Sequence, residues 1–234
     1  MDMVLNTVED VSVKDSMLRF SDSYFYAPKT EVLVLGLGGI GSWLALSLGR
    51  LDCKMYLFDY DNVEAINIAG QLFMGSQEGL SKVRAIEGTV NRFCDMSAEI
   101  QGFQKYTKDS FTGPIVFSCF DNMEARKLAF EKWAEEEDRE LFVDGRMQMI
   151  TGEVYCVIKG REDLYRATLF GDDEIEEAPC NAKASSFSGM TIAGLMTGIF
   201  ANYLGLKKDS DLPVDLPFKT TYNYPLMLFQ SYEQ

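Results

Sequence analysis

A glycine-rich turn between an apolar strand and an apolar helix constrains this chain more than any other feature of its sequence. Residues 32–35 predict a buried parallel strand, and residues 40–48 predict a helix with Gly49 near its end. The glycines of the turn are Gly36, Gly38, Gly39 and Gly41. Such a turn lets phosphate approach the backbone, and the free N–H groups and positive dipole end of the helix favour negative charge. The turn therefore predicts a phosphate-binding site.

A second predicted strand supports this interpretation, because it ends on Asp59. That carboxylate lies roughly 20 residues into the unit, where an acidic residue takes a ribose hydroxyl in nucleotide-binding folds. Strand, glycine turn, helix and acidic strand end follow in the order that nucleotide binding requires. The turn does not by itself distinguish one nucleotide from another.

The first half of the chain alternates between predicted strands and predicted helices. The strands are Glu31–Leu35, Lys54–Phe58, Glu99–Phe103, Ile115–Ser118 and residues 141–143. Alternation of this kind predicts an α/β fold of the Rossmann-like, doubly wound type. Its sheet is mostly parallel with helices on both faces, and ligands bind at the carboxyl ends of the strands.

The second half of the chain predicts an antiparallel extension of this sheet. Residues 153–159 and 165–170 predict antiparallel strands, and residues 190–204 predict a helix. The aromatic-rich residues 218–229 predict a strand that clamps the protein's own sheet or pairs with a partner. We therefore predict a single domain over residues 1–234. Its parts are an N-terminal segment (1–30), a nucleotide-binding half (31–150) and an extension with helix and tail (151–234).

The helix predicted over residues 190–204 contains Gly194 and Gly198, which are four positions apart. This spacing permits close helix packing in proteins and also occurs in membrane helices. We interpret it as core packing, because the apolar run is shorter than the roughly 20 residues that a membrane span needs.

Four further segments follow the glycine turn in a fixed order. They are Asp59-Tyr60-Asp61-Asn62-Val63-Glu64, then Ala65-Ile66-Asn67-Ile68-Ala69-Gly70-Gln71, then Gly79-Leu80-Ser81-Lys82, and last Cys119-Phe120-Asp121-Asn122 with Arg126. The series resembles the ThiF/MoeB superfamily, the adenylating domain of ubiquitin-activating enzymes, over residues 32–204. Because the cysteines form no C-x-x-C pair, the chain resembles a short, zinc-free version of that family.

The resemblance implies an enzyme that uses ATP and Mg²⁺ to adenylate the C-terminal carboxylate of a ubiquitin-like protein or peptide, releasing pyrophosphate. It implies that Gly38 and Gly39 lie under the phosphates and that Asp59 holds the ribose. It also implies that Lys82 contacts the transferred phosphoryl region and that Asp121 holds magnesium. The nucleotide-binding candidates are Gly36, Gly38, Gly39, Gly41, Asp59, Asp61, Asn67, Gln71, Lys82, Asp121 and Asn122.

One departure from the family pattern concerns an arginine near the pyrophosphate, whose position is taken by Gly70. A glycine supplies none of the charge or bidentate hydrogen bonding of a guanidinium. Arg146 is our candidate replacement, and with Lys82 and Asp121 it completes the predicted catalytic set. The alternative for Arg146 is a structural ion pair with Asp144, and Arg126 is a second candidate.

The chain contains no histidine, which excludes Ser-His and Cys-His nucleophile pairs and His-ligated zinc. Adenylation needs no proton acceptor, since a chain-terminal carboxyl with a pKa of about 3.5 is already ionised at pH 7. Two other functions stay open. One is a nucleotide-binding partner protein that has lost adenylation with the Gly70 change, and the other is a Rossmann oxidoreductase that uses NAD.

The five cysteines are Cys53, Cys94, Cys119, Cys156 and Cys180. Cys53, Cys119 and Cys156 lie in apolar strand contexts, so we expect them to pack as small hydrophobic side chains. Cys180 follows an acidic loop and is the candidate for a thioester or persulfide role, although acidic neighbours raise a thiol pKa.

The 22 basic and 36 acidic residues give a net charge of −14, which disfavours nucleic acid and would steer a basic partner toward the protein. The acidic runs at residues 135–138 and 172–177 are predicted to be solvated surface. We see neither a signal peptide nor a membrane span and expect a cytoplasmic protein. The family resemblance also implies a homodimer, to which Arg19 could contribute across the subunits.

Overall fold

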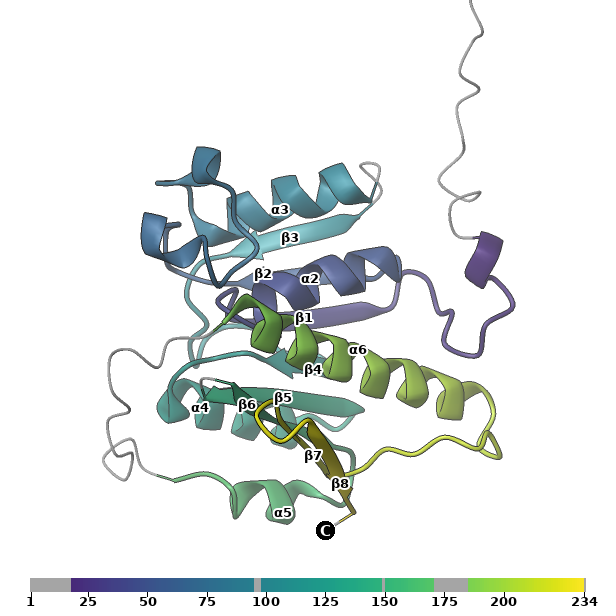
Figure 1. Cartoon of the computed structure of the whole chain (residues 1–234). Coiled ribbons are helices and arrows are strands. Elements are labelled where there is room, and N and C mark those ends of the chain that lie inside the picture. The colour runs from purple at the N-terminus through teal and green to yellow at the C-terminus, as the bar shows by residue number, and fades with distance from the viewer. Residues whose placement is uncertain (1–17, 95–97, 149, 171–184, 234) are drawn as a thin grey trace, which may run out of the picture.

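The computed structural model describes residues 18–94, 98–148, 150–170 and 185–233. These residues form one eight-stranded sheet in the order β3-β2-β1-β4-β5-β6-β7-β8, with helices on both faces (Figure 1). The first five strands are parallel, and the last three add an antiparallel edge. The predicted fold class, a doubly wound and mostly parallel sheet with an antiparallel extension, is confirmed.

The parallel strands are β1 (Glu31–Leu35), β2 (Lys54–Phe58), β3 (Glu99–Phe103), β4 (Ile115–Ser118) and β5 (Leu141–Gln148). The first four have the predicted boundaries. β1 and β4 are apolar runs that lie between other strands and under helices on both faces, so they are almost completely buried. Only β5 extends well beyond its prediction, because it goes on to pair with an antiparallel strand past the point where β4 ends.

Helices cover the two faces of the sheet unequally. α2 (Gly41–Arg50), α3 (Lys82–Phe93) and α6 (Ser186–Lys208) pack on one face, which is toward the viewer in Figure 1. α4 (Met123–Glu135) and the short α5 (Glu162–Arg166) pack on the other face, around Phe130, Trp133 and Phe142. The short 3₁₀ helices are η1 (Leu18–Phe20), η2 (Ala65–Asn67) and η3 (Gly75–Gln77).

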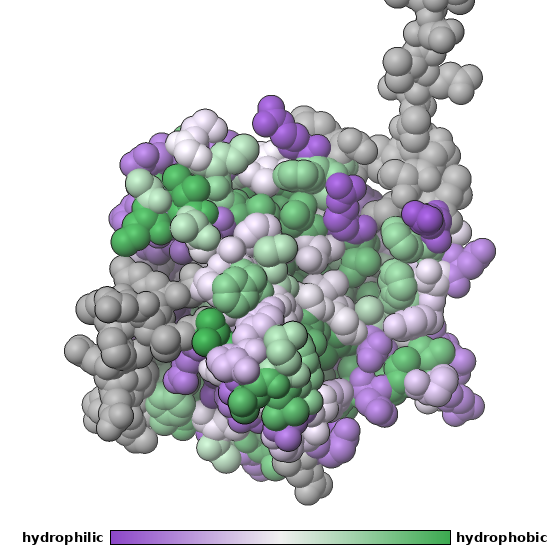
Figure 2. Space-filling view, viewed as in Figure 1, coloured by the Kyte–Doolittle hydropathy of each residue, from purple (hydrophilic) through white to green (hydrophobic). Residues whose placement is uncertain are grey.

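The antiparallel edge is formed by β6 (Thr151–Val157), β7 (Lys219–Asn223) and β8 (Leu228–Tyr232). The tail thus returns as a hairpin on the protein's own sheet, which is one of the two predicted arrangements. Figure 2 shows apolar side chains gathered over this hairpin. The exposed ones are Leu226, Met227, Leu228 and Phe229.

The strand predicted over residues 165–170 is wrong, because this segment begins in α5 and continues as a turn. Tyr165 lies in α5, and Leu169 comes four positions later, after the turn that follows the helix. Tyr165 is fully buried against the rings of Phe130 and Phe142, and Leu169 packs on the same cluster. A strand would also have put both residues on one face, so their spacing did not distinguish the two structures.

The interpretation of Gly194 and Gly198 as core-packing residues is also wrong. Both face solvent, and no atom lies within 4 Å of the Cβ that either would carry. The close approaches of α6 involve Gly189 and Gly205 instead. The reason is helical periodicity: Ile192, Met196 and Phe200 face the sheet, which turns the two glycines outward.

α6 is longer than predicted, with 23 residues. Judged by length and composition, it is the one helix in the described parts of the chain that could cross a membrane, with a mean hydropathy of 1.3. One side of α6 nevertheless forms part of the core, in contact with α2, β5 and β6.

Several smaller predictions concern single residues. Cys53, Cys119 and Cys156 are buried as predicted, and burial raises the pKa of the Cys53 thiol to about 12. Residues 135–138 are exposed at the end of α4, also as predicted. Cys180 and the second acidic run lie outside the described residues. Arg19 is exposed in η1, and its role across a dimer stays a prediction.

Candidate functional site

The carboxyl ends of β1, β2 and β4 lie side by side, because Leu35 is in register with both Phe58 and Ser118. The next residues in the chain are therefore delivered to the same edge of the sheet. They are Gly36 after β1, Asp59 after β2 and Cys119 after β4, and we call this place the carboxyl edge. It is also where the connections turn from one face of the sheet to the other, which is the usual ligand site of such folds.

The glycine turn at this edge leaves no room for side chains at two of its positions. Gly36 has φ +89°, and a Cβ on Gly41 would lie 1.8 Å from the Gly36 carbonyl oxygen. α6 closes on the turn from the side, since a Cβ on Gly189 would lie 2.0 Å from the Gly39 carbonyl oxygen. Close packing of backbone on backbone therefore fixes the shape of the turn.

The turn also presents unused hydrogen-bond donors. Among the described residues, no acceptor is bound by the amides of Gly39, Ile40 and Gly41, and no side chain caps the start of α2. A Cβ on Gly38 would have no atom within 4 Å, so this part of the turn is open. Free N–H groups at a helix N-terminus form an anion site, which is the arrangement that the sequence predicts.

Asp59 is held in place by two backbone amides. Leu37 donates to its Oδ2 at 2.7 Å and Asp61 donates to its Oδ1 at 2.8 Å. Burial raises the pKa of Asp59, while the two N–H donors act in the opposite direction. Each carboxylate oxygen keeps a lone pair, so Asp59 can accept further hydrogen bonds from ribose hydroxyls without moving.

Lys82 and Asp61 form an ion pair at the start of α3, with 2.8 Å between Nζ and Oδ2. The lysine side chain is only 8% exposed, whereas that of Asp61 is 48% exposed. Two backbone bonds clamp the loops together: the Lys82 amide donates to the Asp61 carbonyl and the Val63 amide donates to the Leu80 carbonyl. The Lys82 ammonium is therefore held in one orientation. Its present partner, Asp61, faces solvent, so a phosphate group can take the place of that carboxylate.

The loop that contains Asn67 and Gln71 lies against the first turn of α2. Trp43 donates to the Gly70 carbonyl at 3.4 Å, and the Leu72 amide donates to the Ser42 hydroxyl at 3.1 Å. The Asn67 side chain accepts from the Glu64 amide, and Gln71 has a buried side-chain oxygen without a hydrogen-bond partner. Gly70 thus lies beside the predicted phosphate site, where an arginine would bring charge to it.

Asp121 and Asn122 follow β4 and are both exposed. Asn122 caps α4 by accepting from the Ala125 amide at 2.8 Å, and it donates to the Asp121 carboxylate at 3.2 Å. The described residues contain no group of three acids or other metal-binding side chains. A single carboxylate still fits Mg²⁺, which usually binds through one or two carboxylates together with water and substrate phosphates.

The Arg146 side chain lies on the face of the sheet that α4 and α5 cover. Its Nε donates to Asp144 at 2.7 Å, and its two terminal nitrogens donate to the carbonyl and the hydroxyl of Thr168. The guanidinium also stacks 4.3 Å from the centre of the Tyr155 ring. The structure thus contains the ion pair with Asp144 that was the alternative interpretation.

Sequence reasoning missed Ser42 and Gly189. Ser42 is fully buried and donates to the Gly38 carbonyl at 2.7 Å while accepting from Leu72, so it joins the glycine turn to the next loop. Its position directly after the last glycine of the turn was the available signal. Gly189 gave no signal, because its role depends on how α6 approaches the turn.

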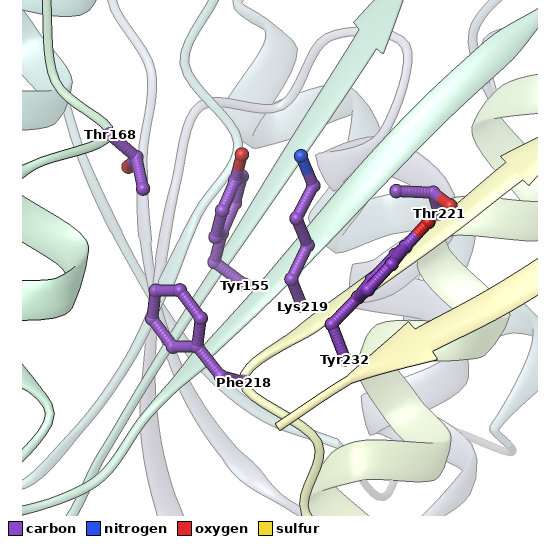
Figure 3. A pocket seen from close by; sticks show the side chains of 6 residues that line it. All are labelled: Tyr155, Thr168, Phe218, Lys219, Thr221 and Tyr232. Atoms are coloured by element: carbon purple, nitrogen blue, oxygen red, sulfur yellow. The ribbon is translucent and has the colours of Figure 1, made fainter. Parts of the chain in front are cut away.

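One pocket of about 290 Å³ lies on the antiparallel half of the sheet (Figure 3). It is lined by Tyr155, Thr168, Phe218, Lys219, Thr221 and Tyr232. None of these residues is a nucleotide-binding candidate, but Tyr155 and Thr168 both contact Arg146.

Comparison with known proteins identifies relatives for most of the chain. The ThiF family model matches residues 26–208. Ubiquitin-like modifier-activating enzyme 5 of Xenopus laevis is 31% identical over 199 residues, which is 74% of this chain and 50% of the relative. The same enzyme of Bombyx mori is 35% identical over 209 residues, covering 78% of this chain and 53% of the relative. This chain therefore spans about half the length of these relatives.

Solved structures show the same fold at lower identity. A crystal structure of PaaA aligns with a TM-score of 0.71 and 20% identity over 100% of this chain and 76% of that one. E. coli MccB with ATP aligns with a TM-score of 0.67 and 13% identity over 94% of this chain and 65% of that one.

Proposed function

Because this chain belongs to the ThiF family, we propose that it adenylates the C-terminal carboxylate of a ubiquitin-like protein or a peptide, using ATP and Mg²⁺. The observation that carries the proposal is the carboxyl edge. This edge carries free backbone amides in the glycine turn, the oriented carboxylate of Asp59 and the ion-paired ammonium of Lys82. The relatives' names support the substrate class, since they are activating enzymes for ubiquitin-like modifiers, and MccB has been solved with ATP and with MccA.

In the proposed reaction, a carboxylate oxygen attacks the α-phosphorus of ATP. A P–O bond forms, the bond to the pyrophosphate oxygen breaks, and pyrophosphate leaves with its electron pair. The amides of Gly39, Ile40 and Gly41 would receive the phosphates, and Asp59 would hold the ribose. Lys82 would leave Asp61 for the transferred phosphoryl group.

Magnesium, when bound at Asp121, would neutralise charge on the phosphates. No side chain needs to remove a proton, because the attacking carboxylate is already ionised at pH 7. This agrees with a chain that has no histidine. The chemistry therefore depends on position and charge.

The first test is nucleotide binding by calorimetry, with Lys82→Ala compared against Lys54→Ala. Lys54 is also ion-paired, with Glu31, but it lies at the amino end of β2. We expect the wild type to bind ATP with Mg²⁺ in preference to NAD. We expect Lys82→Ala to weaken ATP binding by about 10- to 100-fold, since a charge-assisted contact is lost. Binding of NAD without ATP would contradict the proposal and favour the oxidoreductase.

A second candidate is a nucleotide-binding partner protein without adenylation, and Gly70 is the observation that favours it. Such a protein would bind ATP. It would not catalyse ATP–pyrophosphate exchange in the presence of any small protein or peptide that ends in a free carboxylate. Gly70→Arg tests whether the missing charge is the cause. Gly75→Arg is the matched control, because Gly75 is an exposed glycine at the start of η3 with no atom within 4 Å of its Cβ position. Exchange by the wild type would exclude this alternative.

A further inference from the structure

The loop that contains Asp121 is fixed by contacts on both sides. The Cys119 amide donates to the Leu35 carbonyl at 2.8 Å, which joins the start of the loop to β1. The guanidinium of Arg126, from the first turn of α4, donates to the Phe120 carbonyl, directly before Asp121. Arg126 is therefore the side chain that holds the peptide unit between Phe120 and Asp121.

The guanidinium of Arg126 is itself bound by a buried acid, Asp144. Its side chain is 5% exposed and donates to Asp144 Oδ1 at 2.6 Å, while Asp144 is completely buried. The second oxygen of Asp144 accepts from Arg146. Burial opposes ionisation of Asp144, but the two guanidiniums outweigh it and keep its pKa below the ordinary value. The carboxylate of Asp144 thus orients the guanidinium groups of both arginines.

The far end of this chain of contacts is anchored to α5. Thr168 accepts from Arg146 through its carbonyl at 3.0 Å and through its hydroxyl at 2.9 Å. The Thr168 hydroxyl in turn donates to the Tyr165 carbonyl. Arg146 therefore cannot turn away from Asp144 without losing three contacts, so Asp144 presents a fixed oxygen to Arg126.

The geometry points to Arg126 as a positioning residue for Asp121, with Asp144 and Arg146 as its support. This inference rests on the proposed function for the identity of what Asp121 holds. Mg²⁺ demands nearly ideal octahedral geometry, and a site with one protein carboxylate depends on the direction in which that carboxylate points. Residues that orient a metal ligand therefore contribute to metal affinity together with the ligand itself. Arg146 acts in this arrangement through Asp144, without touching the nucleotide.

The test is the variant Arg126→Lys, which keeps the charge but loses the planar fork that reaches Asp144 and Phe120 together. Arg166→Lys is the matched control, because Arg166 also makes a fork, to Glu131 and Asp163, but lies on the surface. The first readout is hydrogen–deuterium exchange of residues 119–123, which needs no nucleotide. We expect about tenfold faster exchange in Arg126→Lys, because the local opening of this loop becomes easier. Exchange in β1 and in the control variant should match the wild type.

The second readout is the ratio of ATP affinity with Mg²⁺ to ATP affinity with EDTA. We expect this ratio to fall about tenfold in Arg126→Lys, which is the usual effect of removing support from a metal ligand. Asp121→Asn should lower it as well, and the double variant should lose no more than Asp121→Asn alone. Additive losses would overturn the positioning role.

Equal exchange at residues 119–123 in Arg126→Lys and Arg166→Lys would also overturn it. So would an increase of equal size throughout the protein, because that reports general loss of stability. If the wild type binds no ATP, the proposed function fails, and the exchange comparison still decides whether Arg126 positions the loop.

Discussion

Two acids of this fold, Asp61 and Asp144, have opposite surroundings, and so do two of its glycines, Gly41 and Gly194. At the carboxyl edge of the parallel half, Asp61 is 48% exposed beside Lys82, while Gly41 is packed against backbone. In β5, Asp144 is 0% exposed between two arginines, while Gly194 on the outer side of α6 is open to solvent. An exposed acid can release its cation to a ligand, whereas a buried acid cannot. The surroundings of each acid, rather than its residue type, therefore decide whether it can bind a ligand or stabilise the fold.

The largest expected effect is on stability and comes from Asp144→Asn. Removing one partner of a buried ion pair leaves uncompensated charge, which costs about 3–5 kcal/mol in the free energy of unfolding. Asp61→Asn is the comparison at the carboxyl edge and should cost less, about 1–3 kcal/mol, because the Asp61 side chain is 48% exposed although Lys82, which loses its partner, is 8% exposed. Urea denaturation of the two variants measures the difference. Equal losses would contradict this difference between the two acids.

The pH dependence of stability should reflect the buried ion pairs of Asp144. Because the folded-state pKa of Asp144 lies below its ordinary value, its contribution is fully present above that ordinary value, about 3.9. The contribution is lost as pH falls through the lowered pKa of the folded state. The gap in unfolding free energy between the wild type and Asp144→Asn should therefore shrink in acid. A gap that stays constant down to strongly acidic pH would show that the charge of Asp144 is not what stabilises the fold.

The sequence predicted the parallel strands well, and most clearly β1 and β4, because these two are buried on both faces and appear as continuous apolar runs. It failed for α5, where the spacing of Tyr165 and Leu169 fits a strand as well as a helix. It also failed for Gly194 and Gly198, because a spacing of four does not reveal which side of a helix meets the core.

The candidate site shows a similar limit of sequence analysis. Motif order predicted that Gly36, Asp59 and Lys82 would meet at one edge, since strand ends in a parallel sheet share a side. The position of Arg146 also had a signal, because Asp144 lies two residues before it and side chains at i and i+2 share one face of a strand. What the sequence could not supply was the third element, Thr168, which takes the remaining nitrogens of Arg146. That contact depends on how α5 packs.

A smaller effect is expected where backbone packs against backbone in the glycine turn. Gly41→Ala would place a Cβ 1.8 Å from the Gly36 carbonyl oxygen, so the turn must shift, at a cost of about 1–3 kcal/mol in stability. Gly38→Ala is the control, because its Cβ meets no atom within 4 Å, and it should stay within about 0.5 kcal/mol of the wild type. Thermal unfolding of both variants without nucleotide makes the comparison. A Gly41→Ala protein as stable as Gly38→Ala would mean that the turn is not tightly packed.

The smallest effect is a gain in stability, from Gly194→Ala and Gly198→Ala in α6. Both positions are exposed and inside a helix, where alanine loses less conformational entropy than glycine, so each change should add about 0.5–1 kcal/mol to the free energy of unfolding. Gly189→Ala in the same helix is the opposing control. Its Cβ would lie 2.0 Å from the Gly39 carbonyl oxygen and should destabilise the protein. The contrary result is a Gly194→Ala or Gly198→Ala protein that is less stable than the wild type, by a difference that grows with protein concentration. That result would show that a second copy of the chain covers this side of α6 in solution.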